Sequence, residues 1–134
     1  MALNALSIDP GRVWKGPWRW FSEDLLDCCV QLGTAKESGI VMDDFACLAR
    51  CNGAEVQISR TDAATRDDWR GALALAASAG AVLVASYDRA ALGQTGSGHF
   101  SPIGGHHRDK DLVLILDVAR FCLKSHPKTG TRER

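Results

Sequence analysis

The feature that most constrains the fold is a pair of apolar segments near the end of the sequence, separated by a polar stretch. His99–Ile103 and Leu112–Val118 have the composition of β-strands, and residues 104–111 between them are rich in glycine and charge. Turn-forming residues between two apolar runs predict a β-hairpin. We expect the hairpin to turn near His107 or Arg108.

Asp117 is out of place in this hairpin on packing grounds. It follows the apolar run Leu112–Leu116, which we expect to be buried on both faces. A buried carboxylate is costly unless it is paired. The expected register places His99 opposite Leu116 or Asp117, and facing residues have Cβ atoms roughly 4.5–5.5 Å apart. We therefore expect an imidazole–carboxylate pair between His99 and Asp117.

Two interpretations of this pair stay open. A histidine held by an aspartate is the base half of a catalytic triad, because the carboxylate fixes the imidazole tautomer and stabilises the imidazolium. Gly96 and Gly98, just before His99, would let a substrate or another backbone approach closely. The alternative is a structural ion pair, since buried pairs also occur far from active sites.

The rest of the sequence predicts helices first and further strands later, which is an α+β arrangement in one domain. Helical spacing of apolar residues and capping residues predict the helices, and alternating or continuous apolar runs predict the strands. The expected helices are 1–8, Glu23–Cys29, Leu32–Ser38, Asp43–Cys51 and Arg66–Ser78, and the expected strands are Ala54–Ser59 and Ala81–Tyr87.

Charge and cysteine content exclude some classes of protein. The 16 basic and 16 acidic side chains balance, which argues against a nucleic-acid partner or a membrane surface. The longest apolar run, around residues 72–85, is too short to span a bilayer. The five cysteines are an odd number and no signal peptide precedes them, so we expect reduced thiols and a cytoplasmic location.

Four of these cysteines form a candidate metal site. Cys47 and Cys51 are four residues apart on one predicted helix, so both thiols face the same way. Together with Cys28 and Cys29 they would make a thiolate site for Zn or Cd. Core packing is the alternative, because adjacent cysteines do not easily direct both side chains to one ion and free cysteine is a common core residue.

An aromatic segment and a pair of adjacent histidines are two further candidate sites. The segment Trp14–Phe21 combines tryptophans with basic residues, as in surfaces that stack on single-stranded nucleic acid. The formal net charge of zero argues against a nucleic-acid partner. We expect the segment to pack against the rest of the domain instead, or to form a wall of a substrate groove. His106 and His107 lie in the predicted turn, where we expect them to be solvated rather than to bind metal.

Several segments, spread over residues 2 to about 121, together form a pattern too specific for chance. They are Leu3–Arg12, Trp14–Phe21, Leu26–Cys29, Cys47–Cys51, Gln94–Gly96, Gly98–Gly105 and Leu114–Phe121. These segments resemble the catalytic domain of the phytochelatin synthase family.

The resemblance implies a papain-like fold and a dipeptidyl transferase activity. In that family a cysteine thiolate attacks glutathione at the bond before its glycine and releases glycine. The γ-glutamylcysteinyl group then passes to another glutathione, which builds metal-chelating peptides. By motif match, His99 resembles the catalytic histidine and Asp117 the catalytic aspartate. Glutathione and metal–glutathione complexes are the implied partners, with heavy-metal ions (Cd, Zn) as possible activators, and homo-oligomer formation stays open.

The sequence also departs from the family. The nucleophilic cysteine should lie about two helical turns before Met1, and the oxyanion-hole side chain lies further upstream. We therefore expect a catalytic-domain fragment truncated at both ends, with residues 1–121 as the partial domain and 122–134 as a divergent tail. Two other functions stay open: a hydrolase that removes glycine from glutathione or its conjugates, and a catalytically inactive, thiol-rich, metal-binding fragment.

Two residues are expected to contact substrate. Gly98 leaves room beside His99. Arg120 lies three residues after Asp117, so strand alternation points it to the opposite face. If the strand ends or bends at Val118, Arg120 could instead clamp a carboxylate of glutathione.

Overall fold

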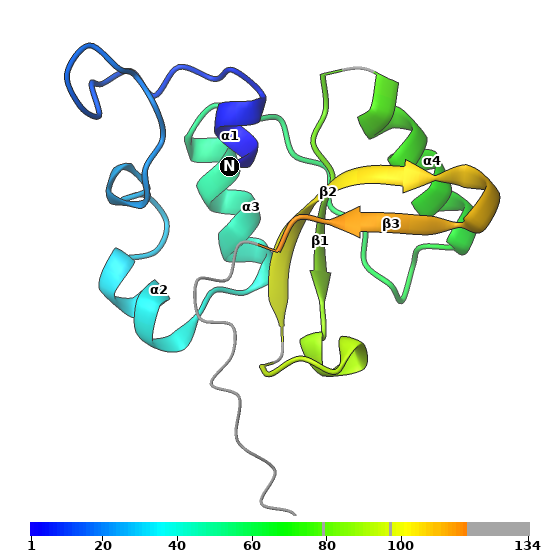
Figure 1. The fold of residues 1–134 in the computed structure, drawn as a ribbon. Helices are drawn as coiled ribbons and strands as arrows, with labels where there is room; N and C mark the ends of the chain where they lie inside the picture. The colour runs from blue at the N-terminus through cyan, green and yellow to red at the C-terminus, as the bar shows by residue number, and fades with distance from the viewer. Residues whose placement is uncertain (79, 97, 118–134) are drawn as a thin grey trace, which may run out of the picture.

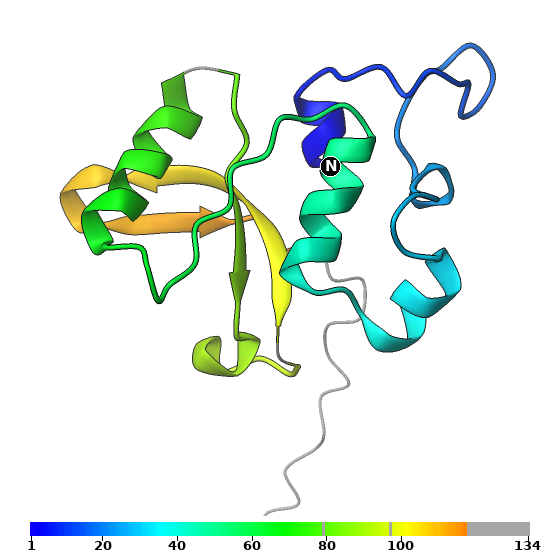
Figure 2. The ribbon, with the colours of Figure 1, turned by 180° about the vertical axis from the view of Figure 1, so that it is seen from behind.

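The computed structural model describes residues 1–78, 80–96 and 98–117. The predicted α+β arrangement is confirmed: four α-helices precede or flank a three-stranded antiparallel sheet in the order β1-β2-β3. Helices α1 to α3 and their loops form one part of the molecule, and the sheet with α4 forms the other (Figures 1 and 2). None of the described helices is both long and apolar enough to cross a bilayer.

The first part of the chain is less helical than expected. Helix α1 covers only Ala2–Ala5, because the chain leaves helical geometry at Ser7, where φ is +56°. A 3-10 turn, η1, spans Glu23–Leu25 in place of the predicted helix Glu23–Cys29. Cys28 and Cys29 therefore lie in a bent loop rather than on a helix.

Helices α2 and α3 form where the sequence predicts them. Helix α2 covers Leu32–Ser38 and α3 covers Met42–Cys51. At the start of α3 the Asp44 carboxylate accepts a hydrogen bond from the backbone N–H of Val41 at 3.3 Å, and acidic residues favour this positive end of the helix dipole. Ala46 on the same helix is only 1% exposed, which marks the face that packs inward.

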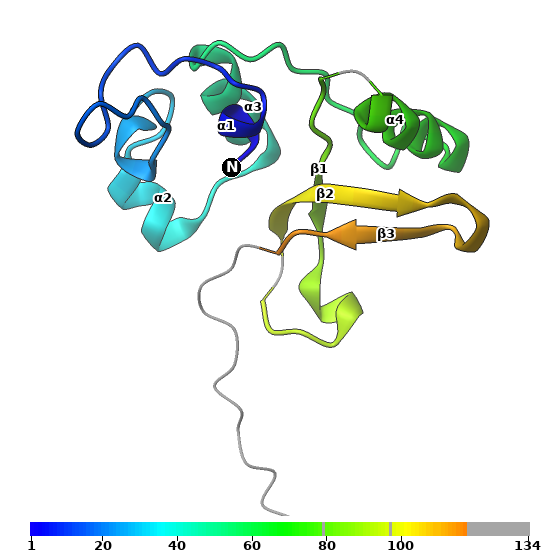
Figure 3. The ribbon, with the colours of Figure 1, turned by 45° about the horizontal axis from the view of Figure 1, so that its top comes forward.

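Helix α4 covers Arg66–Ser78 and is held at its start by a reciprocal cap. The backbone N–H of Asp68 donates to the Thr65 hydroxyl at 3.2 Å, and the backbone N–H of Thr65 donates to the Asp68 carboxylate at 2.8 Å. Leu73 is 3% exposed, and α4 lies along the sheet (Figure 3).

The sheet consists of β1 (Val84–Tyr87), β2 (His99–His107) and β3 (Leu112–Ile115). A 3-10 turn, η3, at Arg108–Lys110 joins β2 to β3, so the hairpin turns about two residues later than predicted. The register shifts between Ile103 and Gly105, which makes Gly104 part of a β-bulge in the strand instead of the turn.

Two strand expectations are wrong. Ala54–Ser59 is not a strand, because no other described strand pairs with it. Strand β3 is not buried on both faces, since Leu112 and Leu114 are each 59% exposed. It is the edge of an antiparallel sheet with one face open to solvent in the described structure. Phe21, Ala46 and Leu73 are the buried apolar side chains of the described residues, so the core is small.

One aromatic contact joins the two parts of the molecule. The rings of Phe45 on α3 and Phe100 on β2 stack with centroids 4.8 Å apart and planes 6° apart. Such pairs contribute beyond the area that they bury. This contact ties the helical part to the strand that begins at His99.

Candidate functional site

The first residue of β2 and a residue just past β3 come together as the sequence predicted. His99 Nε2 lies 3.1 Å from Asp117 Oδ1. The later turn puts Ser101 nearest to the position across from Asp117, so His99 meets the carboxylate diagonally rather than directly. The ring N–H is not well aligned for a hydrogen bond, and the contact is an ion pair when the imidazole is protonated.

A third residue, Arg89, completes this group. Arg89 begins the 3-10 turn η2 (Arg89–Leu92), where the Asp88 carboxylate accepts a hydrogen bond from the backbone N–H of Ala90. Its Nη2 lies 3.1 Å from Asp117 Oδ2, and its Nε donates to Gln94 Oε1 at 3.0 Å. The carboxylate of Asp117 therefore has one oxygen facing a guanidinium and the other facing an imidazole.

Arg89 was missed by sequence reasoning, which named Arg120 as the arginine of interest. Arg120 lies outside the described residues. Arg89 is 7% exposed, and a buried arginine is rare unless it is paired. The signal in the sequence was a single arginine two residues after the apolar strand that ends at Tyr87. Nothing local showed that Asp117 would be its partner.

The imidazole ring is also oriented by its neighbours on the sheet. The rings of Tyr87 and His99 meet edge to face, with centroids 5.9 Å apart and planes at 85°. The Tyr87 hydroxyl lies 3.3 Å from the hydroxyl of Ser101, which is 0% exposed. These contacts limit rotation of both rings, so His99 presents its Nε2 to Asp117 from a supported position.

Two glycines lie in the loop that precedes His99. Gly96 and Gly98 have φ of +95° and +66°, and among the described residues no atom lies within 4 Å of a Cβ placed at either one. Glycine is favoured at both positions by the backbone conformation and not by close contact with the described chain. The space beside Gly98 is consistent with its expected place next to a substrate.

The geometry has a clear chemical consequence. With Nε2 turned to the carboxylate, Nδ1 is the ring nitrogen that could take a proton from a thiol and later return it. Asp117 would stabilise the imidazolium that forms. The arrangement supports general acid–base chemistry, provided that a thiol and a substrate reach Nδ1.

The four candidate metal ligands also come together. Cys28 is paired with Cys51, and Cys29 with Cys47, as disulfides between the loop and α3. The sulfurs of Cys28, Cys29 and Cys51 all lie within 4.8 Å of one another. The structure thus pairs these cysteines where the sequence led us to expect reduced thiols.

The objection that adjacent cysteines diverge does not hold here. Cys29 has a φ of +65°, a left-handed conformation that non-glycine residues rarely adopt. This turn of the backbone directs the side chains of both Cys28 and Cys29 towards α3. The Asn52 side-chain amide lies 3.4 Å from the sulfurs of Cys28 and Cys51, which adds a polar contact to the cluster.

The histidines expected in the hairpin turn lie on a strand instead. His106 and His107 are the last two residues of β2, because the turn begins only at Arg108. The His106 side chain is 13% exposed, and its Nε2 lies 3.6 Å from Asp111 Oδ1. His106 is thus partly buried against the turn, and the prediction that it is solvated is wrong.

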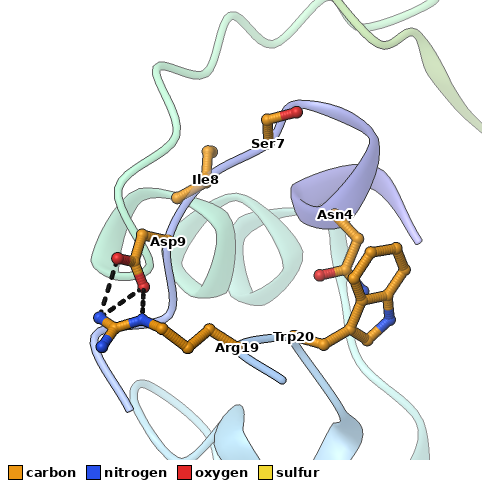
Figure 4. A pocket seen from close by; sticks show the side chains of 6 residues that line it. All are labelled: Asn4, Ser7, Ile8, Asp9, Arg19 and Trp20. Carbon is orange, nitrogen blue, oxygen red and sulfur yellow. Dashed lines mark hydrogen bonds and ion pairs between the residues drawn. The ribbon is translucent and has the colours of Figure 1, made fainter. Parts of the chain in front are cut away.

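Two shallow hollows lie near α1 and the tryptophan loop, away from the His–Asp pair. Trp14, Trp18 and Trp20 line one of them and are 49%, 69% and 53% exposed, so these three side chains do not pack into the core, whereas Phe21 at the end of the same segment does. Figure 4 shows the other, lined by Asn4, Ser7, Ile8, Asp9, Arg19 and Trp20.

The second hollow is shaped by an ion pair. Arg19 Nη2 lies 2.8 Å from an oxygen of Asp9. The backbone N–H of Gly11 and the Arg19 guanidinium hold the pKa of the Asp9 carboxyl below its ordinary value. Neither hollow is lined by His99, Asp117 or a cysteine, so the candidate chemistry is not at either one.

Comparison with known proteins gives a consistent result. A family model described as phytochelatin synthase matches residues 1–127. The chain is 53% identical to glutathione gamma-glutamylcysteinyltransferase 3 of Lotus japonicus, over 94% of the chain and 26% of the relative. It is 54% identical to glutathione gamma-glutamylcysteinyltransferase 1 of Triticum aestivum, over 94% of the chain and 25% of the relative.

A more distant relative has the same name as these two plant proteins. The glutathione gamma-glutamylcysteinyltransferase of Schizosaccharomyces pombe is 42% identical over 90% of the chain and 30% of the relative. The chain therefore spans roughly a quarter of the length of the curated relatives that it matches. No solved structure matches the chain.

Proposed function

This chain belongs to the phytochelatin synthase family, and from that premise we propose that it carries the acid–base residues of glutathione γ-glutamylcysteinyl transfer. The observation that carries the proposal is the 3.1 Å contact between His99 Nε2 and Asp117 Oδ1. The relatives' names supply the donor, glutathione, and the transferred group. A papain-like fold is part of the proposal, because a histidine base oriented by a third group can activate a thiol nucleophile as in that class of enzyme.

Each step of the proposed reaction uses His99 for proton transfer. His99 takes the proton of a cysteine thiol, and the thiolate attacks the carbonyl carbon that precedes the glycine of glutathione. The C–N bond breaks, His99 returns the proton to the leaving glycine amine, and a thioester remains. The amine of a second glutathione then attacks the thioester, His99 takes its proton, and the new peptide leaves as the thiol is restored.

We place the nucleophile outside the described cysteines. Cys28, Cys29, Cys47 and Cys51 are paired with one another, so the partner of each sulfur is another sulfur and not the His99 imidazole. Under this proposal His99 needs a thiol from outside the described residues, and glutathione, free or as a metal complex, is the substrate of the complete active site. We also retain a cytoplasmic location as part of the proposal, since glutathione is abundant in reducing compartments.

Hydrolysis is the second outcome that the same residues allow. If water replaces the second glutathione, His99 activates the water and the thioester yields γ-glutamylcysteine. Both reactions release glycine. Only the identity of the second product separates them.

A chimera tests the proposal most sharply. Residues 1–127 would replace the matching segment of the Triticum aestivum relative, and the chimera would be incubated with glutathione and cadmium. We expect glycine release and a longer γ-glutamylcysteinyl peptide. His99→Ala should lower the rate by about 10³-fold or more.

His107→Ala is the matched control, because His107 ends the same strand but has no place in the mechanism. It should leave the rate near that of the unsubstituted chimera. Equal activity in the His99→Ala chimera would sink the proposal. Release of γ-glutamylcysteine in place of a longer peptide would favour the hydrolase.

A second function, metal binding, is favoured by the convergence of the Cys28, Cys29 and Cys51 sulfurs within 4.8 Å, with Cys47 paired to Cys29. We propose that Cys28, Cys29, Cys47 and Cys51, once reduced, bind Cd²⁺ or Zn²⁺ as thiolates. The ion would offset part of the thiolate charge and join the loop to α3 in place of the two disulfides. Such a site could make the transferase respond to heavy metals.

Spectroscopy of the reduced 134-residue chain tests this site without any assay of activity. Cd²⁺ should produce the ultraviolet absorption of cadmium–thiolate bonds, saturating at one ion per chain. Cys29→Ser with Cys47→Ser should remove most of that signal, while His106→Ala with His107→Ala should leave it intact. An unchanged signal in the double serine variant would contradict the assignment.

A further inference from the structure

The carboxylate of Asp117 contacts both Arg89 and His99. The reaction proposed above gives a role to His99 but none to Arg89. Arg89 Nη2 and His99 Nε2 lie at 3.1 Å from the two different oxygens. The guanidinium is always charged, whereas the imidazole is charged only when it is protonated. Arg89 is therefore the fixed member of the group and His99 the changing one.

We infer that Arg89 is a positioning residue for the His99–Asp117 pair, which it serves by fixing the carboxylate and by offsetting its charge. The inference rests on the proposed function, since it concerns how His99 is kept ready to accept a proton. Arg89 itself touches neither thiol nor substrate in this scheme. It acts through Asp117.

The first half of the argument is geometric. Arg89 is 7% exposed, and its Nε is directed by the hydrogen bond to Gln94 Oε1 at 3.0 Å. A planar guanidinium held at one nitrogen presents its others in a fixed direction. Because one of them meets Asp117 Oδ2, the carboxylate cannot rotate freely, and Oδ1 stays turned to His99.

The second half is electrostatic. An aspartate alone beside a histidine stabilises the imidazolium and so favours a histidine that is already protonated. A protonated histidine cannot act as a base. A guanidinium on the far oxygen reduces the net charge that the imidazole meets from −1 towards zero, so it weakens the preference for a protonated ring. Asp117 can still orient the ring.

The other groups around His99 do not supply a positive charge that offsets the Asp117 carboxylate. Tyr87, on β1, meets the imidazole with its ring, and its hydroxyl is turned to Ser101. Asp88, next to Arg89, uses its carboxylate to accept a hydrogen bond from the backbone of Ala90. Of the charged groups described near the ring, Arg89 is the cation that contacts Asp117.

The test follows His99 by ¹⁵N NMR of its imidazole in the full 134-residue chain as the pH is changed. His99→Gln identifies the signals among those of the four histidines. In Arg89→Met we expect the midpoint of His99 protonation to move to higher pH by about one unit, a tenfold change in the protonation constant. Asp117→Asn should move it in the opposite direction.

Two further variants keep the inference falsifiable if Arg89→Met does not fold. Arg89→Lys keeps the positive charge but lacks the planar guanidinium. Gln94→Ala keeps the arginine but removes the side-chain oxygen that accepts the hydrogen bond from Arg89 Nε. Both should shift the midpoint upward by a smaller amount, about twofold in the protonation constant. They should also populate both neutral tautomers, where the unsubstituted chain favours the proton on Nε2.

A purely structural arginine would give a different result. Substitution would then lower the melting temperature and leave the His99 midpoint and tautomer unchanged in the folded protein. That outcome in Arg89→Met, or in both Arg89→Lys and Gln94→Ala, overturns the inference. Because the titration needs no glutathione, an inactive chimera would count against the proposed function and leave this result untouched.

Discussion

The helical part and the sheet part of the molecule are held together by different chemistry. In the helical part, sulfur atoms join a loop to α3 through Cys28, Cys29 and their two partners. In the sheet part, charged side chains meet around Asp117. The sulfur contacts depend on the redox state and on metals, whereas the ionic contacts depend on pH.

The difference matters because each part makes up for a shortage of apolar burial in its own way. Few apolar side chains are fully buried among the described residues, so cross-links and ion pairs carry a larger share of local order than in a domain with a large core. It also separates the proposed roles. The sulfur cluster would sense metal, and the charged group would move protons.

Removing the sulfur contacts should have the largest effect on stability. Cys47→Ala with Cys51→Ala abolishes both links between the loop and α3. In the oxidised protein we expect a loss of about 3 kcal/mol or more, because each link closes a loop of about 20 residues. Denaturant unfolding measures it, and the His99 titration should not change.

The matched control is the unsubstituted chain in reductant without metal, which should lose a similar amount. Equal stability of the oxidised unsubstituted chain and the double alanine variant would show that the cysteines do not link the loop to α3 in solution.

Breaking the contact between the two parts should have the next largest effect. Phe45→Ala removes the ring that stacks on Phe100 at 4.8 Å and should cost about 2–3 kcal/mol, somewhat less than a fully buried phenylalanine. Phe45→Leu keeps most of the apolar area and should cost about 1 kcal/mol, the contribution of the stacked pair. Thermal unfolding compares the two, and equal losses would show that stacking contributes nothing.

A smaller effect is expected at the bulge of β2. A Cβ at Gly104 would lie 2.8 Å from Leu116 Cγ, so Gly104→Ala must displace the residue just before Asp117. We expect a loss of about 1–3 kcal/mol and a changed His99 signal. Gly105→Ala is the control, since no atom lies within 4 Å of its Cβ position. Similar stability losses in the two variants would remove the steric explanation.

The smallest effect concerns acid and the hairpin turn. The hydrogen bond from Arg70 holds the pKa of the Asp111 carboxyl below its ordinary value, with His106 adding to the effect. A lowered pKa in the folded state means that the contact stabilises the turn above the unfolded pKa and is lost as pH falls through the folded one. Protection of the turn amides against exchange, relative to the intrinsic exchange rate at each pH, should therefore fall below about pH 4.

Arg70→Gln serves as the control for that pH effect. Without the guanidinium, the turn should exchange faster at neutral pH and respond less to acid. An unchanged acid response in this variant would show that Arg70 does not hold the turn.

The sequence predicted the parts of the fold that local chemistry determines. Thr65 and Asp68 form the cap at the start of α4, and α3 ends at Cys51, directly before the helix-breaking pair Asn52-Gly53. Asp117 was recognised as needing a partner because it followed an apolar run. The predicted register was wrong by about two residues, but the predicted contact between Asp117 and His99 still forms, because diagonal neighbours on one face of a sheet are within reach of each other.

Other features depended on contacts between distant residues. Gly104 and Gly105 indicated a turn but lie in strand β2, where the register shifts at Gly104, and Leu116, just past β3, lies close to Gly104. Arg89 lies in a short 3-10 turn without a sequence pattern of its own. The positive φ of Cys29 is a conformation that the sequence does not signal, and it alone lets two adjacent cysteines serve one cluster.

The separation of roles between the two parts is tested most directly by glycine release from glutathione in the chimera, with substitutions made in one part at a time. Under this account Cys29→Ser with Cys47→Ser weakens the response to cadmium and keeps histidine-dependent glycine release. His99→Ala abolishes release with or without cadmium. The opposite pattern, a folded serine variant that releases no glycine beside an active His99→Ala variant, would contradict the account.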